Sequence, residues 1–516
     1  MPRFKPYSYD QMKFVPIDFK NQLQEGTFEF ALNHIIDEMD LSPFHARFHN
    51  DATGASAYDP AILLKVVLFA YSRGITSSRD IERACRENVV FMALSADSHP
   101  HFTTIADFIS SMRAEVTPLF RSVLLICSQE GLIGKQMFAI DGCKISSNCS
   151  KEWSGTRADF ERKKGKLERS IALLLRKHRA MDESEDQAPE MRQKEEASIE
   201  RLRAKVKKIE GFLATHEDKP GRSGRAKQSN ITDNESAKMP SGHGVIQGYN
   251  GLAAVDSKHQ VIVHAEAFGE GHEGQLLRPM LDGIRESFAG IGEPDDVLRQ
   301  AVVVADNGYH SAENVQMVEE EGIEAYLPDH QYRRRDPAFT GAEEHKRSID
   351  RKKTSRRAKY FRRSDFTYDA ATQTMTCPAG KEMYLSCRNY RSRGSYRGVT
   401  FMGRTTHCRV CAIRSQCLRN PQAEGRQVTV MEGRDASGEK TALQRMRDRI
   451  DTARGRFLYS RRMGIIEPVF GHIRDTLELD WFSLRGKIKV DIQWKLFSIV
   501  HNIRKISRFG PRFANG

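Results

Sequence analysis

Two short apolar runs that each lead directly into an aspartate constrain the fold of this chain most. Gln136–Ile140 precedes Asp141, and Ala301–Ala305 precedes Asp306. Runs of this length and composition suit buried strands, so we expect each acid at the carboxyl end of its strand. A helical pattern and another strand-like run follow Asp306, giving a strand, helix, strand unit. The sequence therefore predicts an α/β protein.

The net charge and the lengths of the apolar runs indicate which kind of partner this chain binds. The 516 residues include 81 Lys and Arg against 68 Asp and Glu, a formal net charge of +13. Such an excess attracts polyanions, most often nucleic acid. The longest apolar run, Ala61–Tyr71, is too short to cross a bilayer, and the N-terminus lacks the apolar core of a secretory signal. We therefore expect a cytoplasmic, nucleoid-associated protein with no membrane span.

Residues 1–130 read as mainly helical. Pro60 suits the first turn of a helix, and a second helix is expected after Gly74, capped by one of the residues 76–78. This helix, turn, helix pattern is typical of DNA-reading motifs, but it also occurs in helices that only pack together. Both interpretations stay open.

Apolar residues at helical spacing also predict an inserted hairpin. Ile199, Leu202, Val206, Ile209 and Leu213 form one stripe, an earlier stripe includes Leu167 and Leu174, and acidic residues separate the two. We expect two antiparallel helices here.

The segment from Arg333 to Arg363 carries thirteen Lys and Arg residues against four acids, beside several aromatic side chains. It is either a solvated basic linker or a surface that contacts phosphates and stacks on bases. On the second interpretation, the candidate DNA-contacting residues are Arg333, Arg334, Arg335, Arg356 and Arg357.

Five of the nine cysteines crowd one segment downstream. Cys408-x2-Cys411-x5-Cys417, with Cys377 upstream, offers four thiolates to a tetrahedral Zn²⁺. Reduced thiols without a metal are the alternative. A zinc ion here would stabilise a module and would not cut DNA.

A third acid is needed if Asp141 and Asp306 hold a metal, and Glu467 is the best candidate. Pro468 suits the first turn of a helix, on which Glu467, Gly471, Arg474 and Glu478 would share one face. Converging carboxylates suit Mg²⁺ or Mn²⁺, and an arginine on the same face could clamp a phosphate. An ordinary amphipathic helix would present a similar face.

Three motifs, taken in order, resemble those of bacterial insertion-sequence transposases of the DDE type. They are Ala139-Ile140-Asp141-Gly142-Cys143, Val304-Ala305-Asp306-Asn307-Gly308 and Ile466-Glu467-Pro468-Val469-Phe470-Gly471-His472-Ile473-Arg474. The chain looks most like the eleven-eighty-two group, and the similarity extends to Gly248-Tyr249-Asn250 and to Cys377-Pro378-Ala379-Gly380.

The resemblance implies an RNase H-like catalytic core whose acidic triad is Asp141, Asp306 and Glu467. It also implies DNA-end contacts from Tyr459, Arg462 and Arg474. Two departures affect these contacts: four residues rather than three separate Arg462 from Glu467, and Arg474 stands where lysine is common. Cys143 also replaces a more usual threonine, which we interpret as a change in packing.

In the implied reaction, metal-activated water cleaves the phosphodiester at the element's end, and the released 3′-hydroxyl is joined to target DNA. The expected partners are double-stranded inverted-repeat ends and target DNA, bound by a homodimer or larger assembly. Two other functions remain open: an inactive sequence-specific DNA-binding protein of transposase descent, and a metal-dependent DNA nuclease. A covalent role for Tyr459 is disfavoured because we identify no surrounding set of arginines and histidines.

The fold class expected from these arguments is an α/β, RNase H-like core with a helical N-terminal domain, an inserted hairpin and a Cys-rich zinc module. The expected segments are an N-terminal DNA-binding domain (1–130), the start of the core (131–156), the helical hairpin (157–217), the continued core (218–330), the basic segment and Cys-rich module (331–430), and the Glu-bearing helix with a basic helical tail (431–516).

Overall fold

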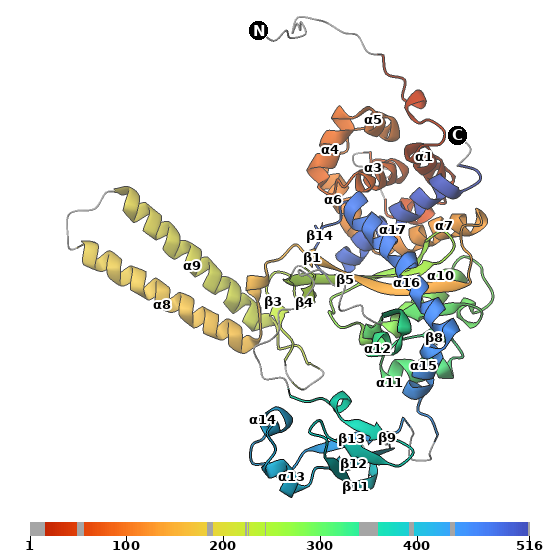
Figure 1. Cartoon of the computed structure of the whole chain (residues 1–516). Helices are drawn as coiled ribbons and strands as arrows, with labels where there is room; N and C mark the ends of the chain where they lie inside the picture. Colours follow the sequence, from red (N-terminus) through yellow and green to blue (C-terminus); the bar gives the residue numbers. More distant parts are fainter. Residues whose placement is uncertain are drawn as a thin grey trace, which may run out of the picture. The chain divides into compact units, whose positions relative to one another are not determined.

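The computed structural model describes residues 16–48, 56–182, 189–221, 224, 226–242, 244–339, 360–391, 397–433 and 439–513 (Figure 1). The chain divides into two compact units. Unit 1 contains residues 1–303 and 462–516, and unit 2 contains residues 304–461. Each unit combines helices with strands, so the expected mixed α/β class is confirmed.

Unit 1 begins with a group of helices. Helix α3 starts at Pro60, as expected, because Asp59 caps it: the Asp59 carboxylate accepts a hydrogen bond from the Ala61 N–H (2.8 Å). Helix α4 follows the turn at Gly74 and has Ser77 at its N-cap. The helices of this group are α1 (Phe28–Glu38), α2 (Ser42–His45), α3 (Pro60–Ser72), α4 (Ser78–Glu87), α5 (Val89–Ser95), α6 (Phe102–Ser111) and α7 (Val116–Gln129).

The last helix of the chain, α17 (Lys487–Phe509), packs among these N-terminal helices. It contacts α1, α3, α6 and α7 on one side and a strand of the sheet on another. Most of its residues are buried, including the full side chain of Trp494. The stretch expected as a basic tail therefore contains a core helix.

The sheet of unit 1 is built on two long antiparallel strands, β1 (Met137–Ser147) and β5 (Gly244–Asp256), paired from Phe138↔Asp256 to Ser146↔Gly248. Along its other edge, β5 pairs with β4 (Ala237–Ser241) and β6 (Ile262–Phe268), while β14 (Trp481–Phe482) runs parallel to the end of β1. Helix α10 (Leu277–Ala289) packs on β5 and β6.

Helices α8 (Arg157–Asp182) and α9 (Pro189–Thr215) lie side by side as a long pair (Figure 1). Phe160, Ile209 and Phe212 form a small apolar cluster at their base, against Trp153. The short strands β2 (Ser154–Gly155) and β3 (Ser229–Asn230) pair beside this cluster. The pair of helices therefore has its own core.

Unit 2 starts within β7 (Val302–Ala305), which ends directly before Asp306 as expected. Helix α11 (Ala312–Glu320) and strand β8 (Glu324–Tyr326) complete the strand, helix, strand unit. Helices α12 (Tyr332–Arg335) and α15 (Ala442–Asp451) belong to the same unit, and α16 (Ala453–Gly471) begins in it.

A second sheet in unit 2 has the order β13-β12-β11-β10-β9, all antiparallel. Phe366, Met375, Val399 and Phe401 are among its buried residues. Its elements are β9 (Thr367–Asp369), β10 (Thr374–Thr376), β11 (Glu382–Arg391), β12 (Arg397–Met402), β13 (Gln427–Met431) and the short helices α13 (Thr405–Arg409) and α14 (Arg414–Cys417).

None of the helices that the structure describes is both long and apolar enough to cross a bilayer.

Candidate active site

Asp141 lies in the middle of strand β1 and not at its carboxyl end, so the expected position was wrong. The strand continues to Ser147 because Cys143, Ile145 and Ser147 turn inward in strict alternation while β5 pairs with the whole length. The expected strand covered only the apolar residues before Asp141, although apolar and polar residues also alternate in the sequence after it. Asp141 therefore projects from a strand held on both sides of it.

The Asp141 carboxylate is paired with Arg462. The Arg462 guanidinium donates through Nη1 to Asp141 Oδ2, and its side chain is only 8% exposed. Arg474 lies near the same face of the strand, where its positive charge lowers the pKa of the Cys143 thiol. Burial nevertheless raises the pKa of Cys143 to about 11, so this thiol is neutral at physiological pH. Unit 1 thus brings Asp141 and two arginines predicted to contact DNA to one strand.

The helix that carries Arg462 and Glu467 is longer than expected. Pro468 lies near the end of α16 and not in its first turn. A proline inside a helix cannot donate to the carbonyl four residues earlier, here that of Gly464. The Gln260 side chain donates to that carbonyl instead (3.0 Å). This replacement partner allows the helix to pass through Pro468.

The predicted polar face of this helix is only partly formed. After Gly471 the chain continues as a π-helix, His472–Thr476, whose wider turn changes the register of Arg474 relative to Glu467. Glu478 lies beyond the helix in a left-handed conformation (φ 56°), so its expected place on the face was wrong. Its side chain packs against Gly74.

Glu467 itself is exposed on α16. No described residue forms a hydrogen bond or an ion pair with its carboxylate. This is the environment of a carboxylate that is accessible to a cation.

Sequence reasoning missed a role for Asn250, which faces Asp141's neighbour Gly142. A Cβ atom at Gly142 would clash with the Asn250 amide, so any larger residue there would force this buried side chain to shift. Asn250 is fully buried and donates to Glu273 (3.2 Å), while its Oδ1 has no partner among the described residues. A buried oxygen without a donor is costly, so it marks a place for a water or a cation.

Asp306 lies in unit 2, beside two tyrosines. The Tyr459 hydroxyl donates to Asp306 Oδ1 (3.5 Å), and the Tyr459 ring packs edge-on against Tyr332 (5.1 Å between centroids). Arg333 donates to the Tyr332 hydroxyl (3.0 Å), and this bond raises the Arg333 pKa, as do Tyr459 and Asp306 nearby. Asp306, Tyr459 and Arg333 therefore lie close together in unit 2, linked through the Tyr332 side chain.

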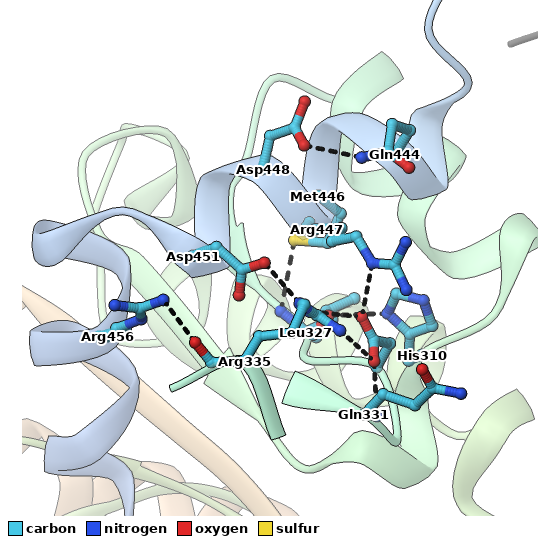
Figure 2. A network of polar contacts seen from close by, with 11 residues as sticks. His310, Leu327, Gln331, Arg335, Gln444, Met446, Arg447, Asp448, Asp451 and Arg456 are labelled. Carbon is cyan, nitrogen blue, oxygen red and sulfur yellow. Dashed lines mark hydrogen bonds and ion pairs between the residues drawn. The ribbon is translucent and has the colours of Figure 1, made fainter. Parts of the chain in front are cut away.

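Arg335 was expected to contact phosphates, but it belongs to an ion-pair network (Figure 2). It donates to both oxygens of Asp329 (2.7 and 3.1 Å) and to Asp451 (2.6 Å). Arg447 also donates to Asp329 (3.3 Å). Arg333 and Arg334 are exposed, whereas Arg356 and Arg357 lie outside the described residues.

The four cysteines predicted to bind zinc line one cavity. Cys377, Cys408, Cys411 and Cys417 all face it, whereas Cys387 does not. Burial raises the pKa of Cys417, and the other three thiols add to this effect. None of the nine cysteines forms a disulfide. The cavity therefore gathers the thiols that the sequence singled out.

Neither candidate metal site is ready-made. Across the residues that the structure describes, no three His, Cys, Asp or Glu side chains lie close enough together to hold a metal ion.

Comparison with known families identifies two parts of the chain. Residues 376–507 match the family described as transposase DDE domain, and residues 17–111 match the family described as transposase domain (DUF772). The first match includes Glu467 and the four cysteines, while Asp141 and Asp306 lie outside both. No curated protein matches the chain. The two matches confirm the resemblance drawn from the motifs: over these two stretches the chain is similar to transposase domains, one of them a transposase DDE domain.

Proposed function

We propose that this protein is a DNA transposase that cleaves the ends of an insertion sequence and joins the 3′-hydroxyl to target DNA. The observation that carries this proposal is the pair of contacts made by helix α16. Tyr459 bonds to Asp306, and three residues later Arg462 bonds to Asp141. The same helix carries Glu467. We infer that the three acids form one catalytic site.

The donor set fits a divalent cation such as Mg²⁺ or Mn²⁺. Carboxylate oxygens from Asp141, Asp306 and Glu467 are the hard ligands that these ions prefer. When bound, such ions would activate water and stabilise charge on the phosphate. Arg462 would then share Asp141 with the cation or leave it, and a freed guanidinium suits a phosphate.

We further propose that the catalytic core is RNase H-like. Its support in unit 1 is the antiparallel series β1, β5, β6, followed by α10. The chain then returns to the start of β1, where the Val302 N–H donates to the Gln136 carbonyl (2.9 Å). Val302, the first residue of β7, therefore lies beside the residue that precedes β1.

For DNA contacts, we propose Tyr459, Arg462 and Arg474 at the element's end and the exposed Arg333 and Arg334 along the backbone. Arg335 is a weaker candidate because two carboxylates already hold it. Arg356 and Arg357 stay predictions. Pairing two ends requires two sites, so we expect a dimer or larger assembly on DNA.

We also propose a structural Zn²⁺ bound by Cys377, Cys408, Cys411 and Cys417. The shared cavity supports this set, because Zn–S bonds of roughly 2.3 Å require all four thiolates to face one space. Cys408→Ser should lose about one equivalent of zinc and lower the unfolding temperature. Cys387→Ser, outside the cavity, should do neither. A wild-type protein purified with zinc in the buffer but containing none would contradict the proposal.

A strand-transfer assay tests the proposed function. The labelled end oligonucleotide is taken from inverted repeats flanking the coding region and is incubated with the full chain, target DNA and Mg²⁺. A transposase gives joined products, a nuclease gives cleaved DNA alone, and an inactive binding protein shifts the DNA without either product. Cleavage without joining, or binding alone, would overturn the proposal in favour of the corresponding alternative.

A further inference from the structure

An open cavity of about 520 Å³ lies in unit 1, where strand β1 ends. Ser147 and Asn148 at the end of the strand line one part, and Trp481 and Arg485 line another. Trp153 and Lys208, at the base of the α8–α9 pair, complete the walls. The volume is within the range of about 300–1,000 Å³ typical of ligand sites.

Trp481 offers this cavity an unused aromatic surface. It is 49% exposed, while its neighbour Phe482 is buried, because strand β14 turns alternate side chains to opposite sides. No described side chain stacks on the Trp481 ring. Covering a half-exposed indole removes apolar surface from water, so a flat group that stacks on the ring would bind favourably there.

The other walls supply positive charge. Lys208, which lines the cavity, lies 5.0 Å from the centre of the Trp153 ring, and Lys163, outside the lining, lies 4.3 Å from the same ring. Arg485 donates to the Asn148 carbonyl (2.7 Å) and to its side-chain oxygen (3.3 Å), which holds the guanidinium at the rim. No carboxylate is among the described residues that line the cavity. Its chemistry therefore suits an anion joined to a flat, stackable group.

We propose that this cavity binds one unpaired nucleotide of the DNA substrate, with its base on Trp481 and its phosphate between Lys208 and Arg485. A base inside a duplex has both faces covered, so only a nucleotide out of the helical stack can occupy the site. The inference rests on DNA as the partner and goes beyond the proposed chemistry at the three acids.

Strand geometry places the nucleotide away from the cleaved bond. Ser147 is six residues along β1 from Asp141, and at about 3.3 Å per residue this is roughly 20 Å. The same length corresponds to about six base pairs of B-form DNA. The bound nucleotide should therefore be several positions from the phosphate that Asp141 addresses.

Binding of the full chain to three matched duplexes tests this site. One duplex carries a single unpaired thymidine about six positions from the end, the second is fully paired, and the third carries an abasic residue in place of the thymidine. The wild-type chain should prefer the unpaired thymidine by about 5-fold to 150-fold, the range for stacking one base. Trp481→Ala should remove the preference, and Trp481→Phe should keep part of it. Lys208→Ala should weaken binding to the thymidine and abasic duplexes, whose unpaired phosphate can enter the cavity, and should leave binding to the paired duplex unchanged.

Tyr384→Ala is the matched control, because Tyr384 is also exposed but lies on the sheet of unit 2. Equal wild-type binding to the thymidine and abasic duplexes would overturn the inference, and so would a preference that survives in a folded Trp481→Ala chain. Because these measurements need no catalysis, a chain that shows the preference but joins no DNA would refute the transposase proposal alone.

Discussion

The surroundings of Asp141 and Asp306 differ in how each carboxylate is held. Asp141 lies within a long strand, between two stretches of paired backbone, and faces a guanidinium with little exposure to water. Asp306 follows the last residue of a four-residue strand, and the contact from Tyr459 is neutral and long. A charged partner in a poorly hydrated place binds much more strongly than a neutral hydroxyl at 3.5 Å.

The two acids are therefore positioned by different kinds of contact. In unit 1 the sheet and Arg462 fix Asp141 directly. In unit 2 the Asp329 network joins Arg335 of α12 to Arg447 and Asp451 of α15, and Asp306 lies in the same unit. Four substitutions or changes of condition test this difference between the two units.

Arg462→Ala should have the largest effect on stability. It leaves the Asp141 charge without its partner in a poorly hydrated place, at a cost of about 3 kcal/mol. Tyr459→Phe should cost only about 0.5–1 kcal/mol. Urea unfolding measures both, with the exposed neighbour Arg461→Ala as the control. Equal losses for Arg462→Ala and Tyr459→Phe would remove the distinction.

Asp329→Asn should cost about 2 kcal/mol, because Arg335 and Arg447 would lose a charged acceptor in a half-buried place. Protease digestion should show faster cleavage within unit 2 than within unit 1. Glu424→Gln, an exposed acid of the same unit, should leave both patterns unchanged. If Asp329→Asn accelerated cleavage within unit 1 more than cleavage within unit 2, the network would not stabilise unit 2 specifically.

Acid should weaken the two units in order. His472 and His501 share a hydrogen bond (2.9 Å), and burial lowers the pKa of each. Their contribution is complete above the unfolded pKa of about 6.5 and is lost as pH falls below it.

Asp329 follows at lower pH. Burial raises its pKa, but hydrogen bonds from Arg335 and from the Gln331 N–H outweigh this and lower it to about 2. Its contribution is therefore lost only between about pH 3.8 and pH 2. Hydrogen exchange followed from pH 7 to pH 3 should show unit 1 opening first. His472→Gln should flatten the early phase and the exposed His45→Gln should not. Early opening of unit 2 would contradict this order.

The smallest expected effect concerns Gln260 and Pro468. Gln260→Ala should cost about 1 kcal/mol, because the Gly464 carbonyl loses its donor. In a Pro468→Ala chain the new backbone N–H can supply that bond, so the same change should cost about half as much. Gln260→Ala also removes the contact between Gln260 and Lys505 in both backgrounds, so the cost of that contact cancels when the two values are subtracted. Equal costs in the two backgrounds would show that Pro468 does not create the need for Gln260.

Much of the local structure could be predicted from the sequence. The Pro60 helix, the strand before Asp306 and the cluster of cysteines follow from short-range patterns of apolar, capping and ligand residues. Each depends on neighbours a few positions away, which a sequence displays directly.

What could not be predicted depends on distant partners. Pro468 appeared to begin a helix because the replacement donor, Gln260, is about two hundred positions away. Arg335 appeared as one more cation in a basic run because its partner Asp451 follows much later. The unpartnered oxygen of Asn250 had no signal beyond its place in a short motif. Tertiary contacts decide which polar groups remain available, and no local pattern records them.

The central claim, that Asp141, Asp306 and Glu467 form one metal-dependent site, is tested most directly by joining of a pre-cleaved, labelled end to target DNA in Mg²⁺. Asp141→Asn, Asp306→Asn and Glu467→Gln should each reduce the joining rate by about 10³-fold or more while the end is still bound. Asp480→Asn, an exposed acid near the same helix, should join at the wild-type rate. If any one of the three variants joined DNA at close to the wild-type rate, the assignment of the site would be wrong.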